Sequence, residues 1–153
     1  MTRLAVLTTT VLLAVPLAAQ SPAAKTYAQK LVDETLQKHH ELLILVMHVT
    51  PPNSSENVII ASNIGRIGKK ADEDDLRVIN TGKTNLEVNA KGDHFEVELV
   101  LEDASGKNIG ALGTVFAYKD GDDKVKLQKA AEKIRDELRK QIPSKEKLFE
   151  SLP

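Results

Sequence analysis

The segment 94–102 (HFEVELVLE) most constrains the fold, because apolar and polar side chains alternate along almost its whole length. One face carries apolar side chains, those of Phe95, Val97, Leu99 and Leu101. The other face carries mostly polar side chains, those of His94, Glu96, Glu98 and Glu102. A period of two is that of a β-strand, and a strand with one apolar face is typical of an antiparallel sheet whose second face meets solvent. The sequence therefore predicts an antiparallel sheet with one buried face.

The rest of the chain supplies partners for this strand. Apolar runs bounded by turn residues predict strands, and apolar side chains at four-residue spacing predict helices. The predicted order is a helix over Lys25 to about Glu41, strands over 42–49 and 57–62, a short helix from the N-cap Asp72 to Gly82, strands over 86–90, 95–101 and 109–118, and a helix from Asp122 or Asp123 to before Pro143. The final ten residues are expected to be frayed. This order predicts an α+β fold, an antiparallel sheet of about five strands with a long N-terminal helix, a short middle helix and a C-terminal helix.

The first residues of the chain have the pattern of an export signal. Arg3 precedes an apolar stretch over residues 4–18, and small residues follow, so cleavage is expected between about residues 19 and 24. A spanning helix needs about 20 apolar residues, which favours cleavage over the alternative of a retained membrane anchor. We therefore expect a signal peptide over 1–24, a domain over 25–142, a C-terminal tail over 143–153, and a periplasmic or secreted protein.

Composition limits the partners and the crosslinks of the chain. The formal net charge is −1, and the chain has no cysteine. A nearly neutral chain favours neither nucleic acid nor an anionic membrane surface as a partner. The domain is therefore expected to be held by burial and hydrogen bonds, without disulfides.

Three polar residues are candidates for binding a ligand. His48 lies in an otherwise apolar predicted strand, where its ring either lines a pocket or finds a partner in the core. Arg66 and Lys69 follow the second predicted strand and could hold an acidic ligand, with arginine forming a bidentate contact. The alternative is a solvated loop in which the neighbouring glycines only permit the turn.

The last predicted strand carries two aromatic candidates and two glycines. Phe116 and Tyr118 could line a pocket, or they could pack beneath a helix. Gly110 and Gly113 are costly inside a strand and indicate close approach by another backbone, a bulge or a ligand.

Catalytic and metal signatures are absent from the sequence. The chain has no cysteine nucleophile, no GxSxG and no HExxH pattern, so we expect no enzymatic activity. The acidic run 72–75 lacks the spacing of a calcium loop, and helix capping explains it. His39, His40 and His94 match no ligand spacing either, so the sequence predicts no metal site and no cofactor.

Two segments resemble a known family. The stretch 57–70 (NVIIASNIGRIGKK) and the stretch 101–110 (LEDASGKNIG) resemble extracytoplasmic sensor domains of the Cache group, which are PAS-like periplasmic sensors. The resemblance covers about Tyr27 to Ile142. It implies a PAS-like sheet with a small metabolite bound between the sheet and its covering loops. The aromatic-Arg-Tyr-Asp pattern of amino-acid-binding members is absent, so their ligand is not implied.

The resemblance also implies a role. Typical members are joined to a membrane helix and an output module, whereas the residues after Ile142 contain no apolar span. We therefore expect a stand-alone, exported sensor-like domain that binds a small metabolite and signals through a separate, membrane-bound partner. Pairing of two copies through the N-terminal helix is a further expectation, against packing of that helix on its own sheet. The alternatives are an exported structural or interaction domain without a ligand, and a small exported enzyme.

Overall fold

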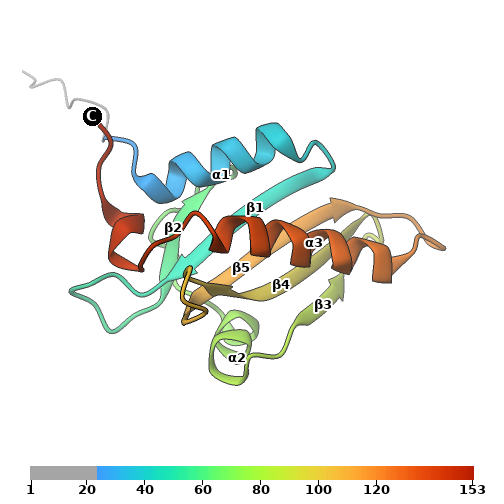
Figure 1. Cartoon of the computed structure of the whole chain (residues 1–153). Coiled ribbons are helices and arrows are strands. Elements are labelled where there is room, and N and C mark those ends of the chain that lie inside the picture. The colour runs from blue at the N-terminus through green and yellow to red at the C-terminus, as the bar shows by residue number, and fades with distance from the viewer. Residues whose placement is uncertain (1–23) are drawn as a thin grey trace, which may run out of the picture.

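A computed structural model describes residues 24–153, which form three α-helices, five strands and a short 3-10 helix (Figure 1). The predicted signal peptide over 1–24 lies outside the described residues, apart from residue 24. The elements are α1 (Tyr27–Lys38), β1 (Leu42–Val49), β2 (Val58–Ser62), α2 (Glu73–Thr81), β3 (Asn85–Val88), β4 (His94–Glu102), β5 (Asn108–Ala117), α3 (Lys124–Arg139) and η1 (Glu146–Phe149). The predicted order of helices and strands is confirmed. At 12 residues, α1 is shorter than the helix expected over Lys25 to Glu41.

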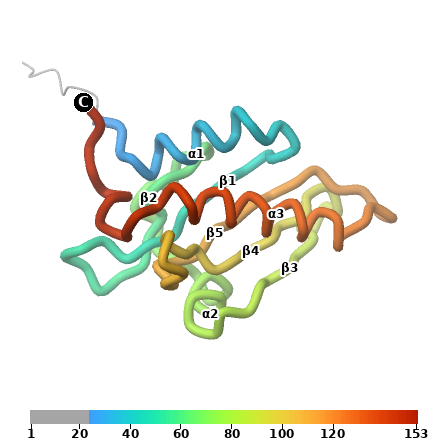
Figure 2. The backbone as a smooth tube through the Cα atoms, viewed as in Figure 1, coloured from blue at the N-terminus to red at the C-terminus, as the bar shows by residue number. Residues whose placement is uncertain are grey.

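The five strands form one sheet in the order β2-β1-β5-β4-β3, and all neighbouring strands run antiparallel. The turn residues over 51–55 and 103–107 predict antiparallel pairing of the strands on either side of each, and both pairs, β1–β2 and β4–β5, are present. The first and last strands of the chain, β1 and β5, meet at the centre of the sheet (Figure 2). The α+β class and the antiparallel five-stranded sheet are therefore confirmed.

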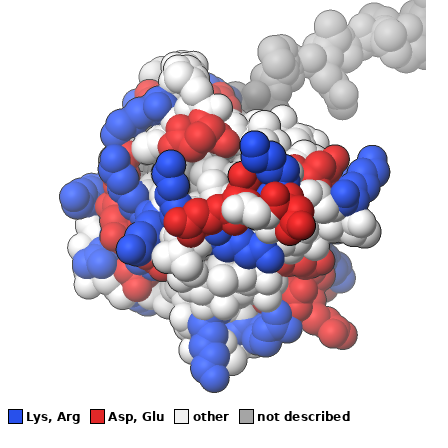
Figure 3. Space-filling view, turned by 90° about the vertical axis from the view of Figure 1, so that its right-hand side faces the viewer, with Lys and Arg blue, Asp and Glu red and all other residues white. Residues whose placement is uncertain are grey.

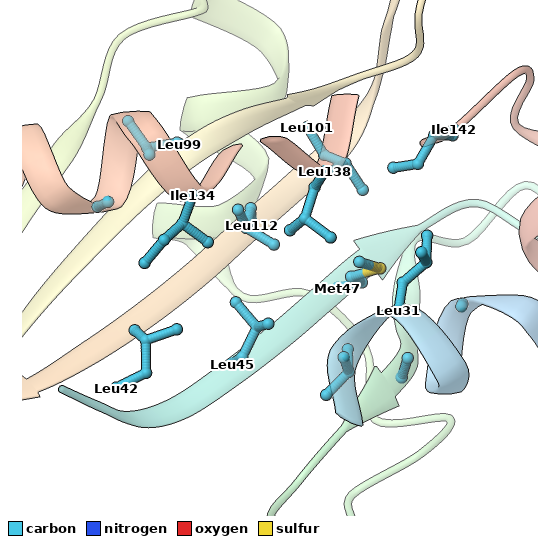
Figure 4. Packing of buried hydrophobic residues seen from close by; sticks show 14 of the residues in the cluster. Leu31, Leu42, Leu45, Met47, Leu99, Leu101, Leu112, Ile134, Leu138 and Ile142 are labelled. Carbon is cyan, nitrogen blue, oxygen red and sulfur yellow. The ribbon is translucent and has the colours of Figure 1, made fainter. Parts of the chain in front are cut away.

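The hydrophobic core lies between one face of the sheet and the helices α1 and α3, which cross in front of it in Figure 1. Figure 4 shows Leu45 and Met47 of β1 and Leu112 of β5 pointing toward Leu31 of α1 and Ile134 of α3. The four apolar side chains of β4 belong to the same core. Each buried side chain of this size contributes about 1.5–3 kcal/mol, so the alternating strand is a main source of stability.

Helix α2 begins and ends as its sequence predicts. The side chain of Asp72 accepts from the amides of Asp74 and Asp75, and the side chain of Asp75 accepts from the Asp72 amide at 3.0 Å. This reciprocal capping box satisfies amides that the helix itself leaves free. Gly82 closes the other end with a φ of 71°, a conformation that favours glycine.

The expectation that the final ten residues are frayed is wrong. Leu148 of η1 is fully buried in the core. The amide of Tyr27 donates to the carbonyl of Glu150, and the amide of Leu152 donates to the carbonyl of Lys25, both at 2.8 Å. The C-terminal segment therefore packs against the start of α1. Burial of its apolar side chains offsets the conformational entropy that is lost when the segment becomes ordered.

Gly110 marks the close approach of another backbone, which is one of the three alternatives that the sequence left open. A Cβ at this position would lie 2.0 Å from the carbonyl oxygen of His48 on the neighbouring strand β1. No side chain fits at that distance. Gly113 is different, because a Cβ there would meet its nearest atoms at 3.6 Å and 3.8 Å.

The surface of the domain mixes charges of both signs. Figure 3 shows one end of the molecule, where Lys and Arg side chains lie beside Asp and Glu side chains. That end therefore presents no extended surface of a single sign. Within residues 24–153, none of the helices has the length and apolar character that crossing a membrane requires.

Candidate functional site

The second face of the sheet, opposite the core, carries a cavity. Helix α2 packs against β4 and β5 on this face, and the Asn108 side chain donates to the carbonyl of Ile79 at 2.7 Å. Beside the helix lies a cavity of about 220 Å³. An adjoining hollow of about 370 Å³ extends it between β1 and β3, sharing Arg66, Glu87 and Glu96 with it. Ligand pockets for drug-sized molecules are about 300–1,000 Å³, so the deep part suits a small ligand.

The wall of the cavity combines an apolar floor with acidic side chains. The apolar residues come from strands β1, β2 and β5 and from residue 64, and they are Ile44, Val46, Ile59, Val115 and Ile64. The acidic residues are Asp72, Asp74, Asp75, Glu87, Glu96 and Glu98. Arg66 and Lys69 are the basic lining residues. Six carboxyl groups face two cationic groups, so the cavity is acidic.

Glu98 is buried at the deep end of this cavity. Its position on β4 was predicted to face solvent, but α2 covers it and leaves it only 7% exposed. The side chain of Asn85 donates to Glu98 Oε2 at 3.1 Å. Carboxylate oxygens of Glu98, Asp72 and Asp75 lie within 4.8 Å of one another. Two buried carboxyl groups and one capping carboxylate therefore converge on one point.

His48 lies against the same point. Its ring is on β1, is 8% exposed, and places Nδ1 3.3 Å from Asp75 Oδ2. The two atoms form no hydrogen bond, and Nδ1 has no other partner among the described residues. Buried polar atoms normally have a partner, so this nitrogen is an exception that needs an explanation.

Burial sets the protonation of the cavity. It raises the pKa of Glu98 to about 8, with the neighbouring charges of Asp75 and Glu96 adding to the effect. Burial likewise raises the pKa of Asp75 and the pKa of Glu96. It lowers the pKa of His48, and the nearby charge of Asp75 only opposes this change. At neutral pH the His48 ring is therefore uncharged, and its contact with Asp75 is not an ion pair.

The loop that follows β2 forms the rim of the cavity. It turns back along β2, where the amide of Ile59 donates to the carbonyl of Lys69 at 2.9 Å and the amide of Gly68 donates to the carbonyl of Ile59 at 2.8 Å. Arg66 sits in this turn with a φ of 64°. A left-handed conformation is costly for a residue with a Cβ, and such strain clusters at ligand-binding loops.

The structure brings together three of the five predicted site residues. His48, Arg66 and Lys69 all line the cavity, with His48 at its deep end and the other two exposed at the rim. Phe116 and Tyr118 do not join them. Phe116 is buried in the core on the opposite face, and Tyr118 packs on the Phe95 ring with centroids 5.9 Å apart. For these two aromatics the packing alternative is correct, because alternate residues of β5 face opposite sides of the sheet.

Sequence reasoning missed the two buried carboxyl groups. Asp75 was interpreted as part of a capping run, and Glu98 as the solvent face of a strand. Capping does occur, but it uses only part of the Asp75 carboxylate. The alternation of β4 was the one available signal, since it places Glu98 opposite the core, on the face where the cavity lies.

Comparison with solved structures finds several matches at low sequence identity. The repressor BlcR of Agobacterium tumefaciens matches with a TM-score of 0.51 and 10% identity, over 76% of this chain and 67% of that one. A GAF domain region from Geobacter sulfurreducens PCA matches with a TM-score of 0.47 and 10% identity, over 72% of this chain and 89% of that one. The inducer-binding domain of PobR from Acinetobacter, in complex with 3-hydroxybenzoic acid, has a TM-score of 0.43 at 10% identity, over 75% and 97% of the two chains.

The likeness to BlcR shows a shared fold. No protein-family model and no curated protein matches the sequence.

Proposed function

We propose that this protein is an exported sensor-like domain that binds a small ligand in the cavity between the sheet and α2. The observation that carries the proposal is the group of buried ionisable side chains His48, Asp75 and Glu98 at the deep end of that cavity. Burying an ionisable group without a charged partner lowers the stability of the fold by about 1–3 kcal/mol or more, so the three groups together cost several kcal/mol. A sheet face with only a structural role would be covered by apolar side chains instead.

The charge of the cavity favours a ligand with a positive group at its deep end. The acidic side chains outnumber the basic ones there, and the basic ones, Arg66 and Lys69, are exposed at the rim. An acidic ligand alone would meet a wall of carboxyl groups that already raise one another's pKa, and these groups resist further negative charge. An anionic group on the ligand is therefore expected to remain near Arg66, while a cationic group enters.

Export and signalling complete the proposal. The apolar stretch that follows Arg3 supports export to the periplasm or the medium. The Cache-like segments 57–70 and 101–110 support a sensor role, with a membrane-bound partner as the receiver of the signal. Mass spectrometry of the mature protein tests export, and an intact Met1 would contradict cleavage.

A thermal-shift screen tests ligand binding. Small amines, amino acids and organic acids are added to the protein in the presence of a chelator, and a ligand that binds only the folded state raises the melting temperature. We expect at least one compound with a cationic group to do so. The absence of any shift across all three classes would favour a structural or interaction domain without a ligand.

Two variants link any shift to the cavity. Gly113→Val places a side chain in the cavity floor, where a Cβ meets no backbone atom within 4 Å, and should abolish the shift. Ala117→Val adds the same type of group at an exposed position of the same strand and should preserve it. An equal ligand shift in both variants would place binding elsewhere and refute the proposed site.

A further inference from the structure

We infer that a divalent metal ion binds at the deep end of this cavity, held by Asp72, Asp75 and Glu98 with His48 as a fourth ligand. The inference rests on the proposed function and deepens it, because it identifies a metal ion as the source of the positive charge that binds at the deep end of the cavity. The cluster comes from three elements that are distant in sequence: the start of α2, β4 and β1.

The spacing of the carboxylates suits a metal ion. One oxygen of each of the three side chains lies within 4.8 Å of the other two. A divalent ion about 2.0–2.5 Å from each ligand holds ligand atoms about 3–5 Å apart. The three oxygens can therefore reach a common ion with little movement of the backbone.

His48 provides the second observation. It is nine-tenths buried, and its Nδ1 has no hydrogen-bond partner although it lies 3.3 Å from a cluster oxygen, Asp75 Oδ2. An imidazole nitrogen beside carboxylate oxygens is a common metal-ligand combination. Coordination of a metal ion would satisfy this buried nitrogen, which no group of the described protein does.

Other hydrogen bonds orient the ligands without occupying all of their oxygens. Asp72 Oδ1 accepts from the amides of Asp74 and Asp75, at 3.1 Å and 3.2 Å, and its Oδ2 accepts from none of the described groups. Asp75 Oδ2 accepts from the Asp72 amide, and Glu98 Oε2 accepts from Asn85. Such outer contacts hold metal ligands in place and tune their affinity.

The donor set selects the class of metal. Carboxylates alone suit Mg²⁺ and Ca²⁺, while an added imidazole favours Zn²⁺, Co²⁺ or Fe²⁺. The positive end of the α2 dipole lies close by and opposes any cation, with about half an elementary charge. Glu73 and Asp74, in the first turn of the helix, offset that charge together with the ligands themselves.

Calorimetric titration of Zn²⁺ into untagged, chelator-treated protein tests the site. We expect one ion per chain and weaker binding of Ca²⁺. Glu98→Gln should weaken Zn²⁺ binding by at least about tenfold, whereas the matched control Glu102→Gln, at the end of the same strand and outside the cavity lining, should change it by less than about threefold. His48→Gln should weaken Zn²⁺ binding and leave the weak Ca²⁺ binding unchanged, since imidazole is a poor ligand for Ca²⁺.

The visible spectrum of bound Co²⁺ gives a second readout. Coordination by a histidine and carboxylates in a site of low symmetry produces absorption that free Co²⁺ lacks, and His48→Gln should alter its position. Circular dichroism of each variant establishes that it is folded. No Zn²⁺ binding by the folded protein, or equal Zn²⁺ affinity in Glu98→Gln and Glu102→Gln, would overturn the inference.

The failures of the two proposals are distinguishable. An organic ligand that raises the melting temperature in chelator, with no Zn²⁺ binding, refutes the metal and leaves the ligand-binding domain. Zn²⁺ binding that depends on Glu98, with no organic ligand found, supports the metal and removes the organic ligand. Zn²⁺ binding that persists in Glu98→Gln and is lost when the exposed His40 is replaced is adventitious, and it overturns the inference.

Discussion

Replacing Glu98 with glutamine should change how stability depends on pH. Burial raises the pKa of Glu98 to about 8 from an ordinary value of 4.5. The folded protein therefore keeps this proton between those values while the unfolded chain has lost it. An acid whose pKa is raised by folding contributes stability that is fully present below pH 4.5 and is lost as pH rises through about 8. The wild-type protein should lose stability steadily across this range.

The magnitude follows from the shift. At about 1.4 kcal/mol per pKa unit, the full change corresponds to about 5 kcal/mol. Because carboxyl oxygens of Asp75 and Glu98 lie within 4.8 Å of each other and both groups have a raised pKa, the pair titrates together, and we expect a measured difference of about 2–4 kcal/mol. Glutamine is neutral at every pH and can still accept the hydrogen bond from Asn85. Glu98→Gln should thus match the wild type near pH 5 and exceed it by that amount near pH 9.

Urea denaturation followed by circular dichroism, at several pH values and with a chelator present, measures the free energy of unfolding. Glu87→Gln is the matched control, since it removes the same charge from an exposed residue at the edge of the cavity. Its stability should run parallel to that of the wild type across the pH range. If Glu98→Gln also runs parallel, Glu98 does not hold a proton in the folded state and the reasoning is refuted.

Three further changes test the fold and the rim. Gly110→Ala should prevent folding or lower the free energy of unfolding by more than about 3 kcal/mol, because its Cβ would lie 2.0 Å from the His48 carbonyl oxygen. Gly113→Ala should leave the free energy of unfolding unchanged or raise it by up to about 1 kcal/mol. Urea denaturation of the two variants measures both values, and equal values would contradict the difference in backbone contact. Arg66→Gly should raise stability by about 0.5–1 kcal/mol by removing the strain at a φ of 64°, and a loss of stability would mean that the turn carries no such strain. Leu148→Ala should cost about 2–5 kcal/mol, and an unchanged urea midpoint would show that η1 does not pack in the core.

The elements themselves were readable from the sequence because their signals are local. Alternation along 94–102 placed a strand with one core face, and Asp72 and Gly82 bounded α2 through capping. These signals depend on backbone geometry over a few residues, which no distant contact needs to supply. The pairing of β1 with β2 and of β4 with β5 followed from the short connections between them.

The site was only partly readable, because it depends on contacts between distant segments. His48, Arg66 and Lys69 were found as polar residues in or beside apolar strands, and the cavity does contain them. Phe116 was a less reliable candidate, since an aromatic side chain on a strand packs in the core or lines a pocket depending on the side of the sheet on which it lies. The face follows from register, which the segment alone does not encode.

What the sequence by itself determined is the set of helices and strands, their order and the apolar faces that must be buried. What only the tertiary structure decided is where α2 packs. By covering the second face of the sheet, α2 turns Glu98 from a solvent-facing residue into a buried one and brings Asp75 to 3.3 Å from His48. The physical reason is that burial and charge proximity are properties of the packed chain: a carboxyl group has no raised pKa until other segments remove its water.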